Sequence, residues 1–138
     1  MLYEKILKID PESGLAVNNL AALLLDRRSD AASLARALEL SKRFEDSTEP
    51  ALVDTLGWAY YRNGDYENAV RYLKIAVDAA DQVPLLHYHL GMAYFAKQSL
   101  ELARKELEQA VNLAKADYDG IEEARETLNR IIETTAAR

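Results

Sequence analysis

Apolar residues recur at three- and four-residue spacing along almost the whole chain, which is typical of amphipathic α-helices. We find no stretch in which apolar and polar residues alternate between turn residues, so the sequence predicts no β-strand. Pro11, Pro50 and Pro84 each precede or open a helical stretch, and Gly64 marks a turn. The pattern therefore predicts an all-α chain of helices joined by short turns.

The second half of the chain contains an internal repeat. Gly57 and Gly91 are 34 residues apart, and five further pairs match at the same offset: Leu56 with Leu90, Tyr60 with Tyr94, Ala69 with Ala103, Leu73 with Leu107 and Ala76 with Ala110. Such self-similarity indicates a repeat architecture. Glycine within a helix costs about 1 kcal/mol relative to alanine. Two glycines at one offset therefore predict two places where helices approach closely.

This period, with its Leu-Gly, Tyr and Ala positions, resembles the tetratricopeptide repeat. The resemblance implies an all-α, right-handed solenoid of antiparallel helix pairs. We expect the closing helix of a truncated upstream repeat at 1–13, repeats at 14–49, 50–83 and 84–117, and a C-terminal capping helix at 118–138. Ala21 precedes Gly57 by 36 residues rather than 34. We attribute the difference to an insertion in the internal turn (DRRSDAAS) of the first repeat and a shortened connection before Pro50. Asp65 is expected to cap the helix that follows it.

Composition and charge narrow the function classes. The 138 residues are 49% hydrophobic and 29% charged, with a net charge of −6, which fits a folded globular chain. The acidic balance counts against nucleic acid as a partner. No signal-peptide pattern or membrane-spanning run appears. Without cysteine there is no disulfide or thiolate chemistry, and the compartment stays open.

No catalytic, metal-binding or cofactor-binding motif is present in the sequence. His87 and His89 are the only histidines, and on a helix they point about 200° apart, so they cannot chelate one metal from one face. The zinc-protease, phosphate-loop and nucleophile-elbow patterns do not occur. We therefore expect a non-enzymatic protein without a cofactor.

The family resemblance implies that the first helices of successive repeats line a concave groove. Large aromatic residues recur on these helices at four- and three-residue steps, which favours recognition of a ligand. The alternative is that the same aromatic side chains pack between neighbouring repeats. The candidate groove residues are Asn18, Asn19, Asp54, Trp58, Tyr61, Arg62, Tyr88, His89, Met92 and Phe95.

One binding mode of the family can be compared by position. Some tetratricopeptide domains hold the C-terminal carboxylate of a peptide with lysine, asparagine and arginine side chains on three first helices. The matching places here hold Asn18, Thr55, Leu85 and His89, without lysine or arginine. Only Arg62 brings a positive charge nearby, so we do not expect this clamp.

The resemblance implies a scaffold that binds a protein or peptide in an aromatic groove and is a fragment of a longer protein. A weaker resemblance, over DTLGWAYYRNGDYENAV and HYHLGMAYFA, is to bacterial tetratricopeptide lipoproteins of exopolysaccharide and PEP-CTERM systems. It implies a periplasmic or envelope-associated location and a groove that contacts saccharide; without this resemblance the expected location is cytoplasmic. A third hypothesis is a rigid spacer. Tyr3, Ile6 and Leu7 of the unpaired first helix predict weak self-association.

Overall fold

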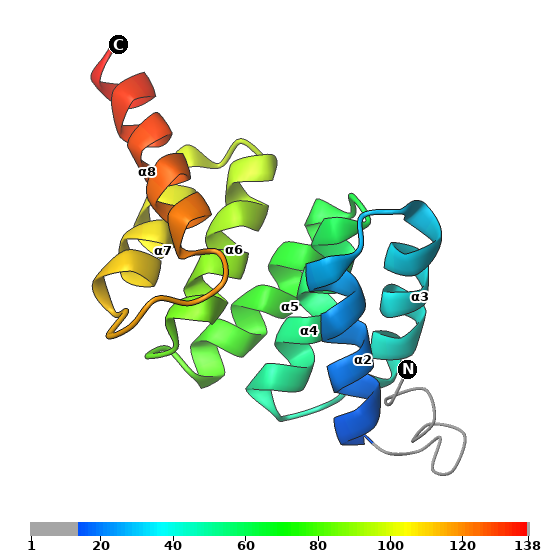
Figure 1. Cartoon of the computed structure of the whole chain (residues 1–138). Coiled ribbons are helices and arrows are strands. Elements are labelled where there is room, and N and C mark those ends of the chain that lie inside the picture. Colours follow the sequence, from blue (N-terminus) through cyan, green and yellow to red (C-terminus); the bar gives the residue numbers. More distant parts are fainter. Residues whose placement is uncertain (1–13, 138) are drawn as a thin grey trace.

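The computed structural model describes residues 14–137, which form seven α-helices, one short 3₁₀ helix and no strand (Figure 1). The α-helices are α2 (Gly14–Arg27), α3 (Ala31–Ser41), α4 (Pro50–Arg62), α5 (Tyr66–Ala79), α6 (Pro84–Ala96), α7 (Leu100–Asn112) and α8 (Ile121–Ala136). The 3₁₀ helix η1 (Lys42–Phe44) follows α3.

The helices form antiparallel pairs stacked along one direction. α2 packs on α3, α4 on α5 and α6 on α7, and α8 packs against α6 and α7 (Figure 1). α2, α4 and α6 are neighbours on one side, while α3 and α5 join each pair to the next from behind. The expectation of an all-α solenoid with a C-terminal helix is confirmed.

Two glycines allow the helices of a pair to approach closely. A Cβ atom built on Gly57 of α4 would lie 2.6 Å from Cγ of Leu73 in α5. One built on Gly91 of α6 would lie 2.7 Å from Cδ2 of Leu107 in α7. Both leucines are fully buried. The repeated glycine therefore marks the same close contact in both pairs, as the sequence pattern predicts.

N-capping residues end the turns between the two helices of a pair. The Asp65 carboxylate accepts a hydrogen bond from the backbone N–H of Asn68, at 3.1 Å, so the predicted cap is confirmed. Gly64 precedes it with a φ of +83°, a left-handed conformation that glycine adopts readily. Asp30 caps α3 in the same way, by accepting from the backbone N–H of Ser33 at 3.0 Å.

The predicted insertion in the first internal turn is wrong. Because Asp30 starts α3 at Ala31, residues 28–30 make a three-residue turn, as residues 63–65 and 97–99 do in the later pairs. The predicted short connection before Pro50 is also wrong. Residues 42–49, which include η1, join α3 to α4, whereas only residues 80–83 join α5 to α6. η1 is held in place by Phe44, which is buried in the core.

Some expectations lie outside this description. The truncated helix at 1–13 and the self-association through Tyr3, Ile6 and Leu7 fall outside residues 14–137. The division into repeats at 14, 50, 84 and 118 stays a prediction. None of the helices between residues 14 and 137 has the length and apolar character needed to traverse a bilayer.

His87 joins three elements behind the concave face. Its Nε2 donates to the backbone carbonyl of Asp81 at 2.7 Å, and its Nδ1 lies 3.2 Å from Glu106 Oε2 of α7. The imidazole is only 6% exposed. With an acceptor at each nitrogen, the protonated ring is favoured. The hydrogen bond to Glu106 raises the pKa of His87 above its usual value, opposed by burial and supported by Asp81.

This arrangement predicts a pH-dependent stability. A raised folded-state pKa contributes stability that is complete below the unfolded pKa of about 6.5 and is lost as pH rises through the folded-state value. The urea midpoint of the wild-type chain is therefore expected to fall from about pH 6 upward. His87→Gln should flatten this slope. An equal slope in that variant would show that another group is responsible.

Candidate functional site

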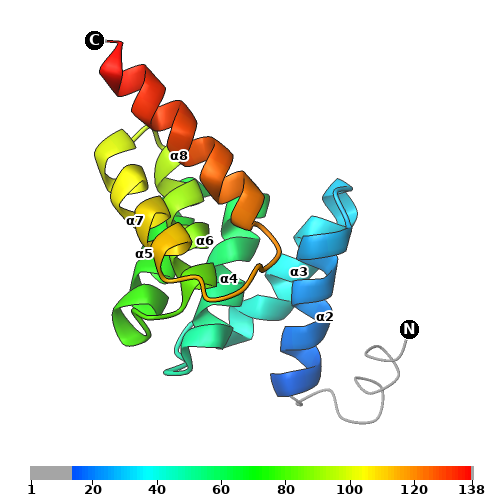
Figure 2. The ribbon, with the colours of Figure 1, turned by 60° about the vertical axis from the view of Figure 1, so that its left-hand side comes forward.

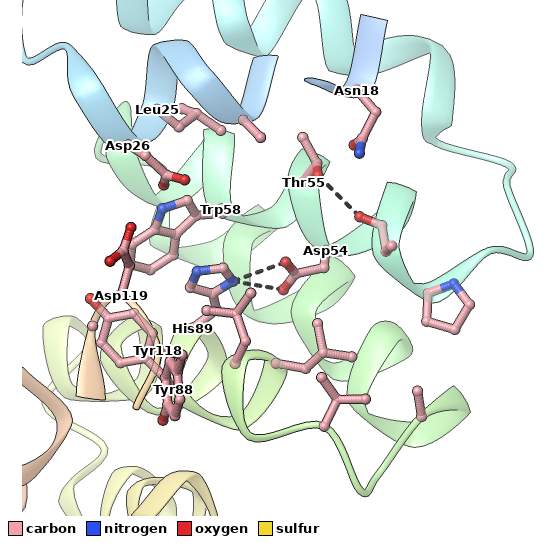
Figure 3. A pocket seen from close by; sticks show the side chains of 18 of the residues that line it. Asn18, Leu25, Asp26, Asp54, Thr55, Trp58, Tyr88, His89, Tyr118 and Asp119 are labelled. Carbon is pink, nitrogen blue, oxygen red and sulfur yellow. Dashed lines mark hydrogen bonds and ion pairs between the residues drawn. The ribbon is translucent and has the colours of Figure 1, made fainter. Parts of the chain in front are cut away.

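The concave side of the solenoid contains a cavity of about 1000 Å³. It lies between α2, α4 and α6, and residues of the α7–α8 connection line one side of it (Figure 3). Figure 2 shows this connection running from α7 toward α2 before α8 begins. This volume is at the upper end of the range of about 300–1,000 Å³ common for ligand pockets. Its walls combine carboxylates and aromatic rings with small and aliphatic side chains. The lining residues are Asn18, Ala22, Leu25, Asp26, Arg27, Glu49, Pro50, Ala51, Asp54, Thr55, Trp58, Arg62, Ala80, Val83, Leu85, Leu86, Tyr88, His89, Tyr118, Asp119 and Gly120.

Trp58 of α4 stands in the wall of the cavity between two other rings. The Tyr61 ring stacks on the indole with centroids 4.4 Å apart and planes at 14°. The His89 ring of α6 stacks on it at 4.0 Å and 20°. Two rings this close on one face would collide, so they cover opposite faces. Trp58 is therefore only 7% exposed and presents an edge to the cavity rather than a free face.

His89 is fixed by a buried carboxylate. Its Nδ1 lies 2.9 Å from both carboxylate oxygens of Asp54, in a pair that joins α6 to α4 (Figure 3). Both residues are less than 9% exposed. Because a buried carboxylate is costly without a partner, the pair fixes the rotamers of both side chains. It thereby fixes the ring that supports Trp58.

Tyr88 connects the aromatic wall to α8. Its ring lies 5.6 Å from that of Trp58, and its hydroxyl donates to Glu123 Oε1 at 2.8 Å. Burial raises the pKa of the Tyr88 hydroxyl, and Glu123 raises it further, so the phenol stays neutral. Gly120, the residue before α8, has a φ of +107° and lies against the Tyr88 ring, where a Cβ would overlap Cε2. The α7–α8 connection therefore rests directly on Tyr88.

Arg62 lies at the cavity, but its guanidinium serves the fold. Nη1 donates to the carbonyl of Leu25 at 2.9 Å and Nη2 to that of Arg28 at 3.2 Å. These carbonyls belong to the last turn of α2 and the residue after it, where helix carbonyls lack intrahelical partners. The expected positive charge of the groove is thus engaged in holding α2 against α4.

The structure brings six of the ten predicted groove residues to the cavity wall: Asn18, Asp54, Trp58, Arg62, Tyr88 and His89. Of the other four, Asn19 points about 100° away from Asn18 around α2. Tyr61 lies against Trp58, and Met92 is buried in the core. Phe95 packs on that core, with the Arg130 guanidinium 5.7 Å from its ring centroid. The alternative of packing between repeats therefore describes much of the aromatic set.

Sequence reasoning missed the contribution of the α7–α8 connection. Tyr118, Asp119 and Gly120 line the cavity although they follow the last helix pair. The Tyr118 hydroxyl donates to the carbonyl of Ala110 in α7 at 2.8 Å, which anchors the connection. The one available signal was Gly120, which stands at the start of a helix in a conformation that other residues rarely adopt.

The two histidines lie in different environments, as their spacing implies. His87 faces Glu106 and His89 faces Asp54. Between residues 14 and 137 we find no group of three or more histidine, aspartate or glutamate side chains arranged to hold a metal ion.

A family model described as tetratricopeptide repeat matches residues 55–119, which contain the two glycine contacts described above. Residues 55–119 therefore carry tetratricopeptide repeats. Part of it is similar to a TPR repeat-containing protein of Pseudomonas aeruginosa, with 35% identity over 68 residues, which are 49% of this chain and 11% of that protein. It is also similar to the sol locus transcriptional repressor of Clostridium acetobutylicum, with 32% identity over 66 residues, 48% of this chain and 21% of the repressor.

Solved tetratricopeptide structures share the fold of nearly the whole chain. The first TPR of Spaghetti (RPAP3), bound to the HSP90 peptide SRMEEVD, has a TM-score of 0.73 and 22% identity and covers 92% of this chain and 96% of its own. The Thermus thermophilus protein TTC0263 has a TM-score of 0.76 and 24% identity, and the match covers 97% of this chain and 71% of that protein. The Sgt2 TPR domain from Aspergillus fumigatus has a TM-score of 0.74 and 17% identity, and the match covers 92% of this chain and 83% of that domain. At these identities the likeness establishes the fold.

Proposed function

We propose that this tetratricopeptide chain is a non-catalytic protein-interaction scaffold that holds an extended segment of a partner protein in the cavity between α2, α4 and α6. The observation that carries the proposal is the cavity itself, a concave space of about 1000 Å³ with both polar and apolar walls. Extended peptides gain affinity from apolar pockets and specificity from a few placed polar groups.

The similar structures support binding of a protein segment. The RPAP3 domain, which has this fold, was solved with a bound peptide. In the present chain, Asn18 stands at the cavity wall (Figure 3), and its Oδ1 is buried with no hydrogen-bond partner among residues 14–137. An unpaired buried acceptor costs free energy. A small movement of the amide would let it accept from a backbone N–H of a bound segment.

Saccharide binding and a spacer role are less well supported. Sugars are bound against open aromatic faces, whereas both faces of Trp58 are covered by Tyr61 and His89. A spacer has no need of a cavity with a buried, unpaired amide oxygen in its wall. The protein-segment proposal accounts for both features.

The proposal is tested by filling the cavity without disturbing the core. Ala51 lies in the first turn of α4, is exposed and lines the cavity. Ala51→Trp is expected to lower the affinity for peptides selected from a random display library by at least tenfold, because the new ring occupies their space. Ala32→Trp, on the exposed side of α3, is the matched control.

Fluorescence anisotropy of labelled selected peptides measures the affinities. Equal binding by the wild-type chain, Ala51→Trp and Ala32→Trp would place the ligand outside the cavity. Failure to select any peptide on the folded chain would refute the proposed function.

A further inference from the structure

Two carboxylates lie at one end of the cavity without a cation between them. Asp26 belongs to the last turn of α2 and Asp119 to the α7–α8 connection, and both lie beside Trp58 (Figure 3). Within residues 14–137 neither carboxylate forms an ion pair. Loss of contact with water raises the pKa of Asp26, and the charge of Asp119 raises it further, against the opposite effects of His89, Arg27 and Arg62.

The cavity as a whole carries more negative than positive charge. Four carboxylates line it, those of Asp26, Glu49, Asp54 and Asp119, against the two guanidinium groups of Arg27 and Arg62. The guanidinium of Arg62 is engaged by the carbonyls of Leu25 and Arg28. Asp54 faces His89. A ligand at this end would therefore meet the charges of Asp26 and Asp119, together with the guanidinium of Arg27, which also lines the cavity.

The opposite end of the cavity is mostly apolar, with the Glu49 carboxylate before α4 as its charged group. The first turns of α4 and α6 lie there, because these helices run parallel to α2 and begin where α2 begins. Pro50, Ala51, Val83 and Leu85 line this end. Val83 and Leu85 remain 41% and 37% exposed, which is high for large aliphatic side chains. A ligand that covered them would gain free energy from burying apolar surface.

We propose that the occupant of the cavity is a basic segment of a partner protein, in which a lysine or arginine side chain lies between Asp26 and Asp119 and neighbouring apolar residues cover Val83 and Leu85. The inference rests on the proposed function and names the chemistry of its ligand. A cation between the two carboxylates relieves their mutual repulsion and forms charge-assisted hydrogen bonds with both.

The aromatic walls suit the stem of such a side chain. Trp58 and Tyr118 line the cavity next to the two carboxylates (Figure 3). The methylene groups of lysine or arginine pack on aromatic surface while the charged end meets the carboxylates. An acidic segment would instead add negative charge to a cavity that already has an excess of it.

The charge preference is tested with a random peptide library displayed at low salt. The selection is run on the wild-type chain and on two charge-matched double variants. Asp26→Asn/Asp119→Asn removes the two cavity charges. Asp46→Asn/Asp117→Asn removes two exposed charges from connecting loops outside the cavity, where the Asp117 side chain is 85% exposed.

We expect peptides enriched on the wild-type chain to contain lysine or arginine. They should bind Asp26→Asn/Asp119→Asn at least tenfold more weakly and the control variant within about twofold of the wild type, with affinity falling as salt rises. Replacing the basic residue of an enriched peptide by methionine should also cost at least tenfold. The thermal unfolding midpoint of each variant verifies that it is folded.

The outcomes separate this inference from the proposed function. Peptides that lack basic residues, lose binding to Ala51→Trp and bind Asp26→Asn/Asp119→Asn normally would overturn the charge preference and leave a cavity that binds protein segments. Enrichment of acidic peptides would do the same. Absence of any enriched peptide on the folded chain would overturn both.

Discussion

Asp54→Ala is expected to destabilise the fold by about 3–5 kcal/mol, since breaking a buried pair leaves the other group without its partner. Asp54 is 5% exposed, and both its oxygens lie 2.9 Å from His89 Nδ1. Without the carboxylate, His89 Nδ1 loses this hydrogen-bond partner and the ring keeps its contacts with Trp58 and Tyr88, so the junction between α4 and α6 loosens. Because whole domains are stable by only about 5–15 kcal/mol, this is a large share of the total.

Urea unfolding followed by fluorescence of Trp58, the single tryptophan, measures this loss. Asp54→Asn keeps an acceptor oxygen and the side-chain shape, so it should destabilise the fold less than Asp54→Ala. The difference between the two variants separates the contribution of the hydrogen bond from that of the charge. Asp78→Ala is the control. Its carboxylate pairs with Lys74 on the surface, where both side chains are mostly exposed, and its removal should have little measurable effect. A cost below about 1 kcal/mol for Asp54→Ala would show that the pair adds little to stability.

The second large effect is expected at the helix contact of the middle pair. Gly57→Ala places a methyl group 2.6 Å from Leu73 Cγ and 3.0 Å from the Leu73 backbone nitrogen. Overpacking of this kind costs about 1–3 kcal/mol, and the backbone contact places the cost near the upper end. The better helix preference of alanine returns about 1 kcal/mol. We therefore expect a net loss of about 2 kcal/mol.

A double-mutant cycle with Leu73→Ala identifies the cause. In the Leu73→Ala background the space is open, so Gly57→Ala should become neutral or stabilising. Gly14→Ala is the control, since a Cβ there meets no atom of residues 14–137 within 4 Å. Equal costs of Gly57→Ala in both backgrounds would mean that Leu73 is not the obstacle.

The sequence alone predicts the fold well because the close contacts repeat at a fixed spacing. Gly57 and Gly91 mark the two glycine contacts, and Asp65 marks a helix start. The same reasoning misplaced the extra length of the first pair because the capping role of Asp30 was overlooked. A cap of this kind is a local signal and was available from the sequence.

The site was less predictable, for a geometric reason. Helical spacing shows that Trp58, Tyr88 and Met92 occupy equivalent faces, but a face next to a neighbouring helix and a face next to a groove have the same period. Only the positions of His89 and Tyr61 show that the indole faces are covered. Asp119 reaches the cavity through a connection that no repeat spacing describes.

The wall formed by Tyr118, Asp119 and Gly120 has a consequence for copy number. These residues belong to the connection 113–120 between α7 and α8, whereas residues 80–83 alone join α5 to α6. A connection as short as 80–83 has no chain to spare for such a wall. Within residues 14–137 the wall therefore belongs to the α7–α8 junction, and a further pair joined as α5 and α6 are would lengthen the solenoid without building a second copy of it.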